Sequence, residues 1–126
     1  MNTNEVAAKL VSMCKQGKFL ESGDLLWSDD VLSVEPMTGE MAELRGKVAL
    51  QRKGEWFVKS NEVHGLKIEG PYLNGDQFIV RFVMDLTNKE SGGRYTLDEL
   101  GVYTVKKGKI TEERFFVTEE YFSRQV

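Results

Sequence analysis

The spacing of the hydrophobic residues changes abruptly near residue 61, and this change restricts the folds open to the chain. Before it, apolar residues recur at helical spacing, as Val6, Leu10 and Cys14 do, which is typical of amphipathic helices. After it, apolar and polar residues alternate in long segments rich in aromatic and β-branched types, which is typical of strands. Helices followed by an antiparallel meander predict an α+β fold, with the helices packed on one face of a curved sheet.

The predicted elements follow one another without a repeat, a linker or a low-complexity segment. Three helices, over residues 2–17, 18–27 and about 47–61, and a short strand at Val31–Glu35 precede four long strands, "VHGLKIEG", "DQFIVRFVMDLT", "RYTLDELGVYTV" and "KITEERFFV". Because 126 residues suit one hydrophobic core, the whole chain, residues 1–126, is expected to form one domain.

Composition excludes several classes of function. The formal net charge of −3 gives no electrostatic reason to expect binding to nucleic acid or to an anionic membrane. Cys14 is the one cysteine, so neither an internal disulfide nor a cysteine metal cluster is expected. No phosphate loop, metal-ligand spacing, leader or membrane-spanning segment is recognisable, and we therefore expect a cytoplasmic protein without cofactor or metal.

Two charged residues occupy unusual places in apolar elements. Glu35 closes an apolar strand just before Pro36, where its carboxylate faces either water or a cavity. Lys53 falls in the middle turn of an apolar stripe on the third helix, formed by Ala49, Leu50, Trp56 and Phe57. Such a lysine either extends along the stripe to water or enters a cavity, where it requires a carboxylate partner. We predict that Lys53 and Glu35 form that pair.

The alternation of side chains along the strands predicts the orientation of the one histidine and favours a homodimer. His64 shares its parity with Leu66 and Ile68, so it is predicted to point toward the core, as a structural residue or a chemical one. The long strands are apolar on both faces, which favours a second burial partner, most simply another copy of the chain. A homodimer is therefore expected, joined through the face that carries Val83, Leu100 and Val102.

The stretches "LLWSDDVLSVEP", "KGEWFVKSNEVHGLKIEGPY" and "YTVKKGKITEERFF" resemble the SnoaL-like polyketide cyclases of the nuclear transport factor 2-like superfamily. The resemblance covers nearly the whole chain and implies a cone of three helices on a strongly curved sheet. In the related ketosteroid isomerases, a carboxylate directly before the proline of a "DD-x-x-x-x-D-P" stretch is the general base inside the cone. Glu35, before Pro36, stands at that position. The two oxyanion donors of the isomerases correspond to Leu10 and Gly101, so steroid isomerisation is not implied.

The resemblance also implies which side chains point inward. The predicted pocket binds an apolar small molecule, with Glu35, His64 and Lys53 as catalytic residues and Trp27, Trp56, Phe82, Met84, Glu99 and Tyr103 as ligand-binding residues. Arg81, Asp85 and Asp98 resemble the Asp-Arg-Asp set of limonene epoxide hydrolases in residue type. Their spacing differs from that set, however, and the alignment places them on the outer face.

Three functions fit these patterns. The first is a cofactor-independent acid–base enzyme, a cyclase, isomerase or dehydratase acting on an apolar substrate. The second is a ligand-binding protein in which Glu35 and Lys53 form a structural ion pair, and the third is a dimerisation module. The fold does not decide among them, because folds of this kind support unrelated functions.

Overall fold

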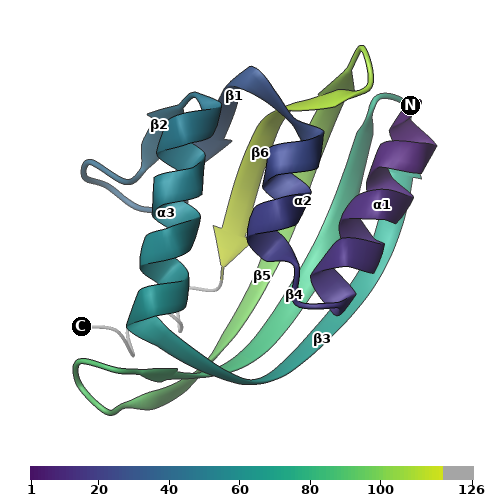
Figure 1. The fold of residues 1–126 in the computed structure, drawn as a ribbon. Helices are drawn as coiled ribbons and strands as arrows, with labels where there is room; N and C mark the ends of the chain where they lie inside the picture. Colours follow the sequence, from purple (N-terminus) through teal and green to yellow (C-terminus); the bar gives the residue numbers. More distant parts are fainter. Residues whose placement is uncertain (118–126) are drawn as a thin grey trace.

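The computed structural model describes residues 1–117, which form three helices on one face of a six-stranded sheet (Figure 1). The elements are α1 (Thr3–Lys15), α2 (Phe19–Leu26), β1 (Trp27–Val34), β2 (Glu43–Arg45), α3 (Lys47–Ser60), β3 (Asn61–Asn74), β4 (Gln77–Asn88), β5 (Arg94–Lys106) and β6 (Lys109–Val117). The strand order is β2-β1-β6-β5-β4-β3, antiparallel throughout except for the parallel pair β1–β6. The predicted α+β fold is confirmed.

Local sequence explains where α1 begins and ends. The side chain of Asn2 accepts a hydrogen bond from the backbone of Glu5, and the Glu5 side chain accepts one from the backbone of Asn2. This capping box satisfies amide groups that the first turn of a helix leaves without partners. Gly17 follows the helix with a φ of 76°, a left-handed conformation that glycine adopts without steric cost.

The hydrophobic core lies between the helices and the inner face of the sheet. Its residues come from the three helices and from β1, β4, β5 and β6: Val6, Ala7, Leu10, Val11, Cys14, Leu26, Val31, Leu50, Phe78, Val80, Phe82, Met84, Leu86, Leu97, Tyr103, Val105 and Ile110. The rings of Phe78 and Tyr103 stack at 4.9 Å between centroids. Within residues 1–117, no helix is both long enough and apolar enough to cross a membrane.

Two details differ from the sequence-based prediction. β2 lies inside the predicted loop, because its three residues pair with Leu32, Ser33 and Val34 of β1 rather than forming a strand by their own pattern. β1 itself begins at Trp27, directly after α2, and is longer than the predicted strand. Tyr121 and Phe122 follow the last predicted strand, and the sequence does not decide whether they close the cone or pack at a dimer; both lie outside the described residues.

Candidate functional site

The inner face of β1 leads directly to Glu35. Val31 and Ser33 are fully buried on that face, and Glu35 has the same parity in the chain. The backbone N–H of Glu35 donates a 2.7 Å hydrogen bond to the carbonyl of Ala42, which holds the residue in place just beyond the strand. Glu35 is therefore directed to the interior beneath α3, as predicted.

Lys53 of α3 meets Glu35 there. Its ammonium forms an ion pair with Glu35 Oε1 and donates a 3.0 Å hydrogen bond to Ser33 Oγ. It also lies 5.2 Å from the centroid of the Phe115 ring, within the range of a cation–π contact. The side chains of Lys53 and Glu35 are 19% and 14% exposed, so the pair lies at the boundary between core and solvent. The structure thus contains the predicted ion pair.

Besides the predicted Glu35 and Glu99, a carboxylate that the sequence patterns did not reveal lies in the core near this pair. Glu113 of β6 is paired in register with Ser33 of β1, and its side chain is buried. Trp27 Nε1 donates a 2.7 Å hydrogen bond to one carboxylate oxygen, and Ser33 Oγ lies 3.1 Å from the other. Burial raises the pKa of Glu113, while Lys53 and the two hydrogen bonds act in the opposite direction. In the sequence, Glu113 shares its strand parity with the apolar Phe115, and this pattern was the available indication that the Glu113 side chain points inward.

Glu99 and Tyr103 of β5 lie on the inner face on either side of Gly101. A Cβ atom on Gly101 would stand 2.8 Å from the Tyr103 ring and 3.0 Å from its hydroxyl oxygen, so the missing side chain leaves room for that ring. Within residues 1–117, neither the Glu99 carboxyl nor the Tyr103 hydroxyl has a hydrogen-bond partner in the protein. In the described residues, every side-chain N or O atom that is fully shielded from solvent has a hydrogen-bond partner. The Glu99 carboxyl and the Tyr103 hydroxyl have none, so both groups retain some contact with solvent.

The protonation of these two groups differs from that of a surface residue. Burial raises the pKa of Glu99 to about 8, the negative charge of Glu35 adds to the effect, and Lys53 opposes it. Burial likewise holds the pKa of Tyr103 well above its usual value, with a further contribution from Glu113. Near neutral pH, both groups therefore carry a proton that they can donate in a hydrogen bond.

The raised pKa of Glu99 predicts a stability effect that depends on pH. Below about pH 4.5 the carboxyl is protonated in both folded and unfolded chains, and it imposes no penalty. As the pH rises to about 8, only the unfolded chain ionises, so the penalty grows and is complete above that pH. We expect Glu99→Gln to stabilise the protein in urea unfolding at about pH 8.5 but not at about pH 4. The exposed Glu90→Gln should show no such gain, and a gain from Glu99→Gln that is equal at both pH values would contradict the assignment.

The remaining predicted pocket residues divide into two groups. Phe82 and Met84 are buried in the core as expected, and Trp27 is half-buried against it. Trp56, in contrast, is 60% exposed, so its predicted place in the pocket wall is wrong. At about 100° per residue, Trp56 stands about 120° around the helix from Leu50, whereas Phe57 lies nearly in line with it.

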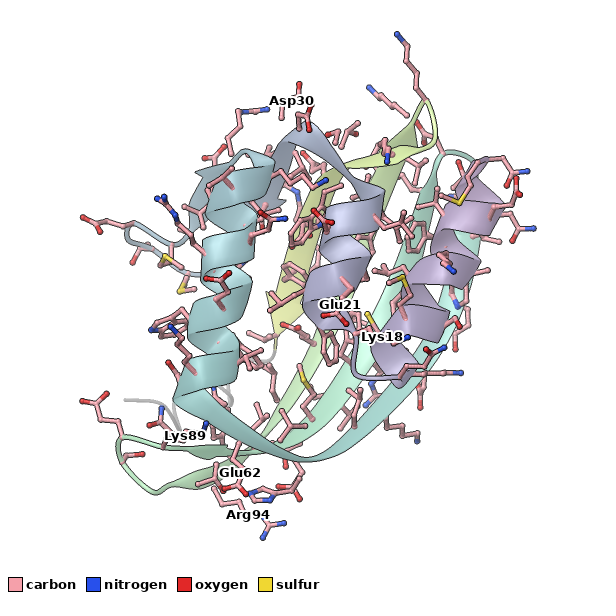
Figure 2. The ribbon with its side chains drawn as sticks, in the orientation of Figure 1. Lys18, Glu21, Asp30, Glu62, Lys89 and Arg94 are labelled. Atoms are coloured by element: carbon pink, nitrogen blue, oxygen red, sulfur yellow. The ribbon has the colours of Figure 1, made fainter. Side chains whose placement is uncertain are left out.

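The inward orientation predicted for His64 is also wrong. A β-bulge between Val63 and Gly65 interrupts the alternation of β3, and His64 is the extra residue that it introduces. Its exposed ring lies 2.7 Å from Thr87 Oγ1, away from Glu35. Figure 2 shows Glu62 and Arg94 projecting at this same end of the sheet.

The acidic residues considered beside Arg81 lie on the outer face. Arg81 forms a bidentate pair with Asp98 at 2.9 and 2.7 Å, and Arg94 forms one with Asp85 at 3.0 and 2.7 Å. These side chains alternate with the buried Phe82 and Met84, which point to the core, so they cannot contribute to the site around Lys53.

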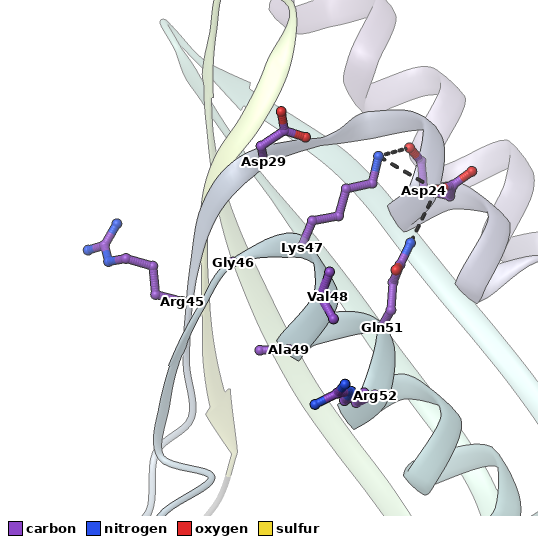
Figure 3. A pocket seen from close by; sticks show the side chains of 9 residues that line it. All are labelled: Asp24, Asp29, Arg45, Gly46, Lys47, Val48, Ala49, Gln51 and Arg52. Carbon is purple, nitrogen blue, oxygen red and sulfur yellow. Dashed lines mark hydrogen bonds and ion pairs between the residues drawn. The ribbon is translucent and has the colours of Figure 1, made fainter.

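A surface pocket lies elsewhere, at the N-terminal end of α3 (Figure 3). Its lining residues are Asp24, Asp29, Arg45, Gly46, Lys47, Val48, Ala49, Gln51 and Arg52. Lys47 and Gln51 both contact Asp24, so the charge of that carboxylate is already partnered within the protein. In the part of the chain that the structure describes, no group of three or more His, Cys, Asp or Glu side chains could hold a metal ion.

Fold and site together define an α+β cone of the nuclear transport factor 2-like class, with acidic groups and a lysine beneath its helices. Residues 1–117 match the family model of the SnoaL-like domain, and the chain belongs to that family. A proposed SnoaL-like polyketide cyclase from Mesorhizobium loti is 48% identical, with a TM-score of 0.89 over 92% of this chain and 99% of that one.

Two more distant structures show the fold alone. A proposed isomerase from Bacillus subtilis is 18% identical, with a TM-score of 0.77 over 98% of this chain and 96% of that one. A nuclear transport factor 2-like protein from Burkholderia thailandensis is 14% identical, with a TM-score of 0.82 over the same shares of the two chains. Among curated proteins, no significant match to the sequence was found.

Proposed function

We propose that this protein binds an apolar small molecule carrying a carbonyl group and catalyses a proton transfer on it. One arrangement supports this function above all: the Glu35–Lys53 pair, the Glu99 carboxyl and the Tyr103 hydroxyl all belong to the interior beneath the helices. The last two have no hydrogen-bond partner within residues 1–117. Apolar walls with a few convergent polar groups are typical of small-molecule sites.

In the proposed reaction, Glu35 accepts a proton from the carbon next to the carbonyl. The protonated Glu99 and Tyr103 donate hydrogen bonds to the carbonyl oxygen, where negative charge develops as that proton leaves. The side chain of Lys53 lies beside Glu35 and contacts its carboxylate. The cyclase description of the Mesorhizobium protein agrees with chemistry of this kind.

A ligand-binding protein without turnover is the second candidate. Lys53 already contacts Glu35, Ser33 and the Phe115 ring, so its charge is satisfied before any ligand arrives. A structural ion pair of this kind would shape a pocket without reacting in it. Both candidates require the same ligand contacts, and they differ only in whether Glu35 accepts a proton.

Ligand binding is tested with a panel of apolar ketones and enones in thermal-shift assays, together with native mass spectrometry for co-purified molecules. For a compound that binds, Tyr103→Phe should weaken the affinity about 2- to 10-fold, the effect of losing one hydrogen bond. Tyr72→Phe, on an exposed tyrosine of β3, is the matched control and should leave the affinity unchanged. A panel and a mass spectrum that both reveal no ligand would contradict the proposal.

We further propose that the protein is a homodimer joined through the outer face of its sheet. Leu100 is 41% exposed and Phe116 is 50% exposed on neighbouring strands, and Ile79, Val83 and Val102 extend the apolar surface. A two-fold related copy would cover this surface with an identical one. Light scattering at micromolar concentration should give a dimeric mass, and Leu100→Glu should give a monomer. A monomeric mass for the unaltered protein would contradict the proposal.

A further inference from the structure

Beneath Lys53, a continuous hydrogen-bonded chain runs into the core and ends at Glu113. Lys53 Nζ donates to Ser33 Oγ, Ser33 Oγ donates to Glu113 Oε2, and Trp27 Nε1 donates to Glu113 Oε1. The four side chains come from α3, β1 and β6, and the parallel register of the two strands sets Ser33 directly opposite Glu113. The reaction proposed above makes no use of Glu113.

The carboxylate of Glu113 connects Trp27 to the serine that Lys53 contacts. A neutral amide has one acceptor oxygen, which would serve the Trp27 indole, whereas the carboxylate also accepts from Ser33 through its second oxygen. An anion is useful there only to a cation, and Lys53 is the cation acting on Glu113 within residues 1–117. One serine hydroxyl separates the two.

We propose that Glu113 is a positioning residue that acts through Ser33 to hold the ammonium of Lys53 beside Glu35. In this arrangement Lys53 is attracted from both sides, by Glu35 at the boundary with solvent and by Glu113 in the core. The ammonium therefore stays in place when Glu35 accepts a proton and loses its negative charge. This consequence rests on the proposed function, whereas the anchoring of Lys53 does not.

The chain carries its own reporter of Glu113, together with an internal control. Trp27 and Trp56 are its two tryptophans. Within the described residues Trp27 donates a hydrogen bond to Glu113, whereas Trp56 is 60% exposed and makes no such bond. The indole N–H signal of Trp27 in proton–nitrogen correlation spectra should follow the ionisation of Glu113. Besides Lys53, the titratable groups that act electrostatically with Glu113 are Glu35, Glu99, Tyr103 and Cys14.

The first arm tests whether Lys53 and Glu113 are coupled. In the unaltered protein, the Trp27 indole should titrate above the ordinary range of a glutamate, since the pKa of Glu113 is raised. Lys53→Met should move this midpoint to still higher pH because the cation that favours the charged carboxylate is lost. The signal of the exposed Trp56 indole should show no such titration in either protein. A Trp27 midpoint that is the same with and without Lys53 would overturn the proposal.

The second arm tests whether Glu113 holds Lys53. A hydrogen-bonded lysine ammonium exchanges slowly enough to give an N–H signal at low temperature, and Lys53 should give one. Glu113→Gln preserves the size of the side chain and an acceptor for Trp27, yet it should abolish that signal. Ser33→Ala should also abolish the Lys53 N–H signal, while the hydrogen bond from Trp27 Nε1 to Glu113 remains. This variant still tests the proposal if the Glu113→Gln protein does not fold. Ser28→Ala, on the same strand, is the control.

The outcomes separate this proposal from the function proposed above. If the Lys53 N–H signal is unchanged in Ser33→Ala and in any Glu113→Gln protein that folds, Glu35 alone holds the ammonium. That result would overturn the positioning role of Glu113, whether or not the protein turns over a substrate. Conversely, loss of the signal supports the role even if no substrate is ever turned over. Where a substrate exists, Glu113→Gln should lower kcat more than it changes KM, because a positioning effect acts on the chemical step.

Discussion

Replacement of Glu35 by glutamine is expected to lower kcat by about 10²–10⁴-fold for any substrate that the unaltered protein turns over. Glutamine keeps the size of the side chain and can still bond to its neighbours, but it cannot accept a proton as a carboxylate does. Glu35 is suited to the role of base because it stands at the end of an apolar strand, beside Lys53 and open to solvent at 14%. Ligand affinity should change little.

Glu40→Gln is the matched control, since Glu40 lies in the exposed loop that follows Glu35. Stopped-time product assays under saturating substrate would measure kcat for the two variants and the unaltered protein side by side. Equal kcat for Glu35→Gln and the unaltered protein would rule out the base role. If affinity were retained and no turnover occurred in any of the three proteins, the ligand-binding candidate would be favoured instead.

Replacement of Lys53 by methionine is expected to lower the free energy of unfolding by about 3–5 kcal/mol, the usual cost of removing one partner of a buried ion pair. The loss is large because the ammonium pairs with Glu35, donates a hydrogen bond to Ser33, and favours the ionised form of the buried Glu113. Methionine fills a similar volume, so lost packing adds little. Urea unfolding at neutral pH would measure the change.

Two further variants make this measurement specific. Lys59→Met, on the exposed side of the same helix, should cost less than about 1 kcal/mol. Lys53→Met combined with Glu35→Gln should be more stable than the sum of the single losses predicts, by about 0.5–3 kcal/mol, because the unpaired carboxylate is gone. Strictly additive losses would show that Lys53 and Glu35 do not interact in solution.

Short-range patterns in the chain were sufficient for the three helices, for the long strands and for one contact of the site, but not for β2. The change from helical spacing to alternation predicted helices before residue 61 and strands after it, as observed. Because side chains alternate along a strand, the parity that buries Val31 and Ser33 also directs Glu35 inward. Because helical neighbours lie three and four residues apart, Lys53 had to follow Leu50 toward the core, where a carboxylate was the partner it required.

The other features of the site depend on contacts between distant parts of the chain. Ser33 and Glu113 are 80 residues apart, and only the parallel pairing of β1 with β6 makes them neighbours. The bulge that turns His64 outward arises from the register of β3 against β4, which no alternation within β3 reveals. A strand pattern states which side chains share a face. The pairing of strands decides which of them meet, because hydrogen-bond register is a property of two segments and not of one.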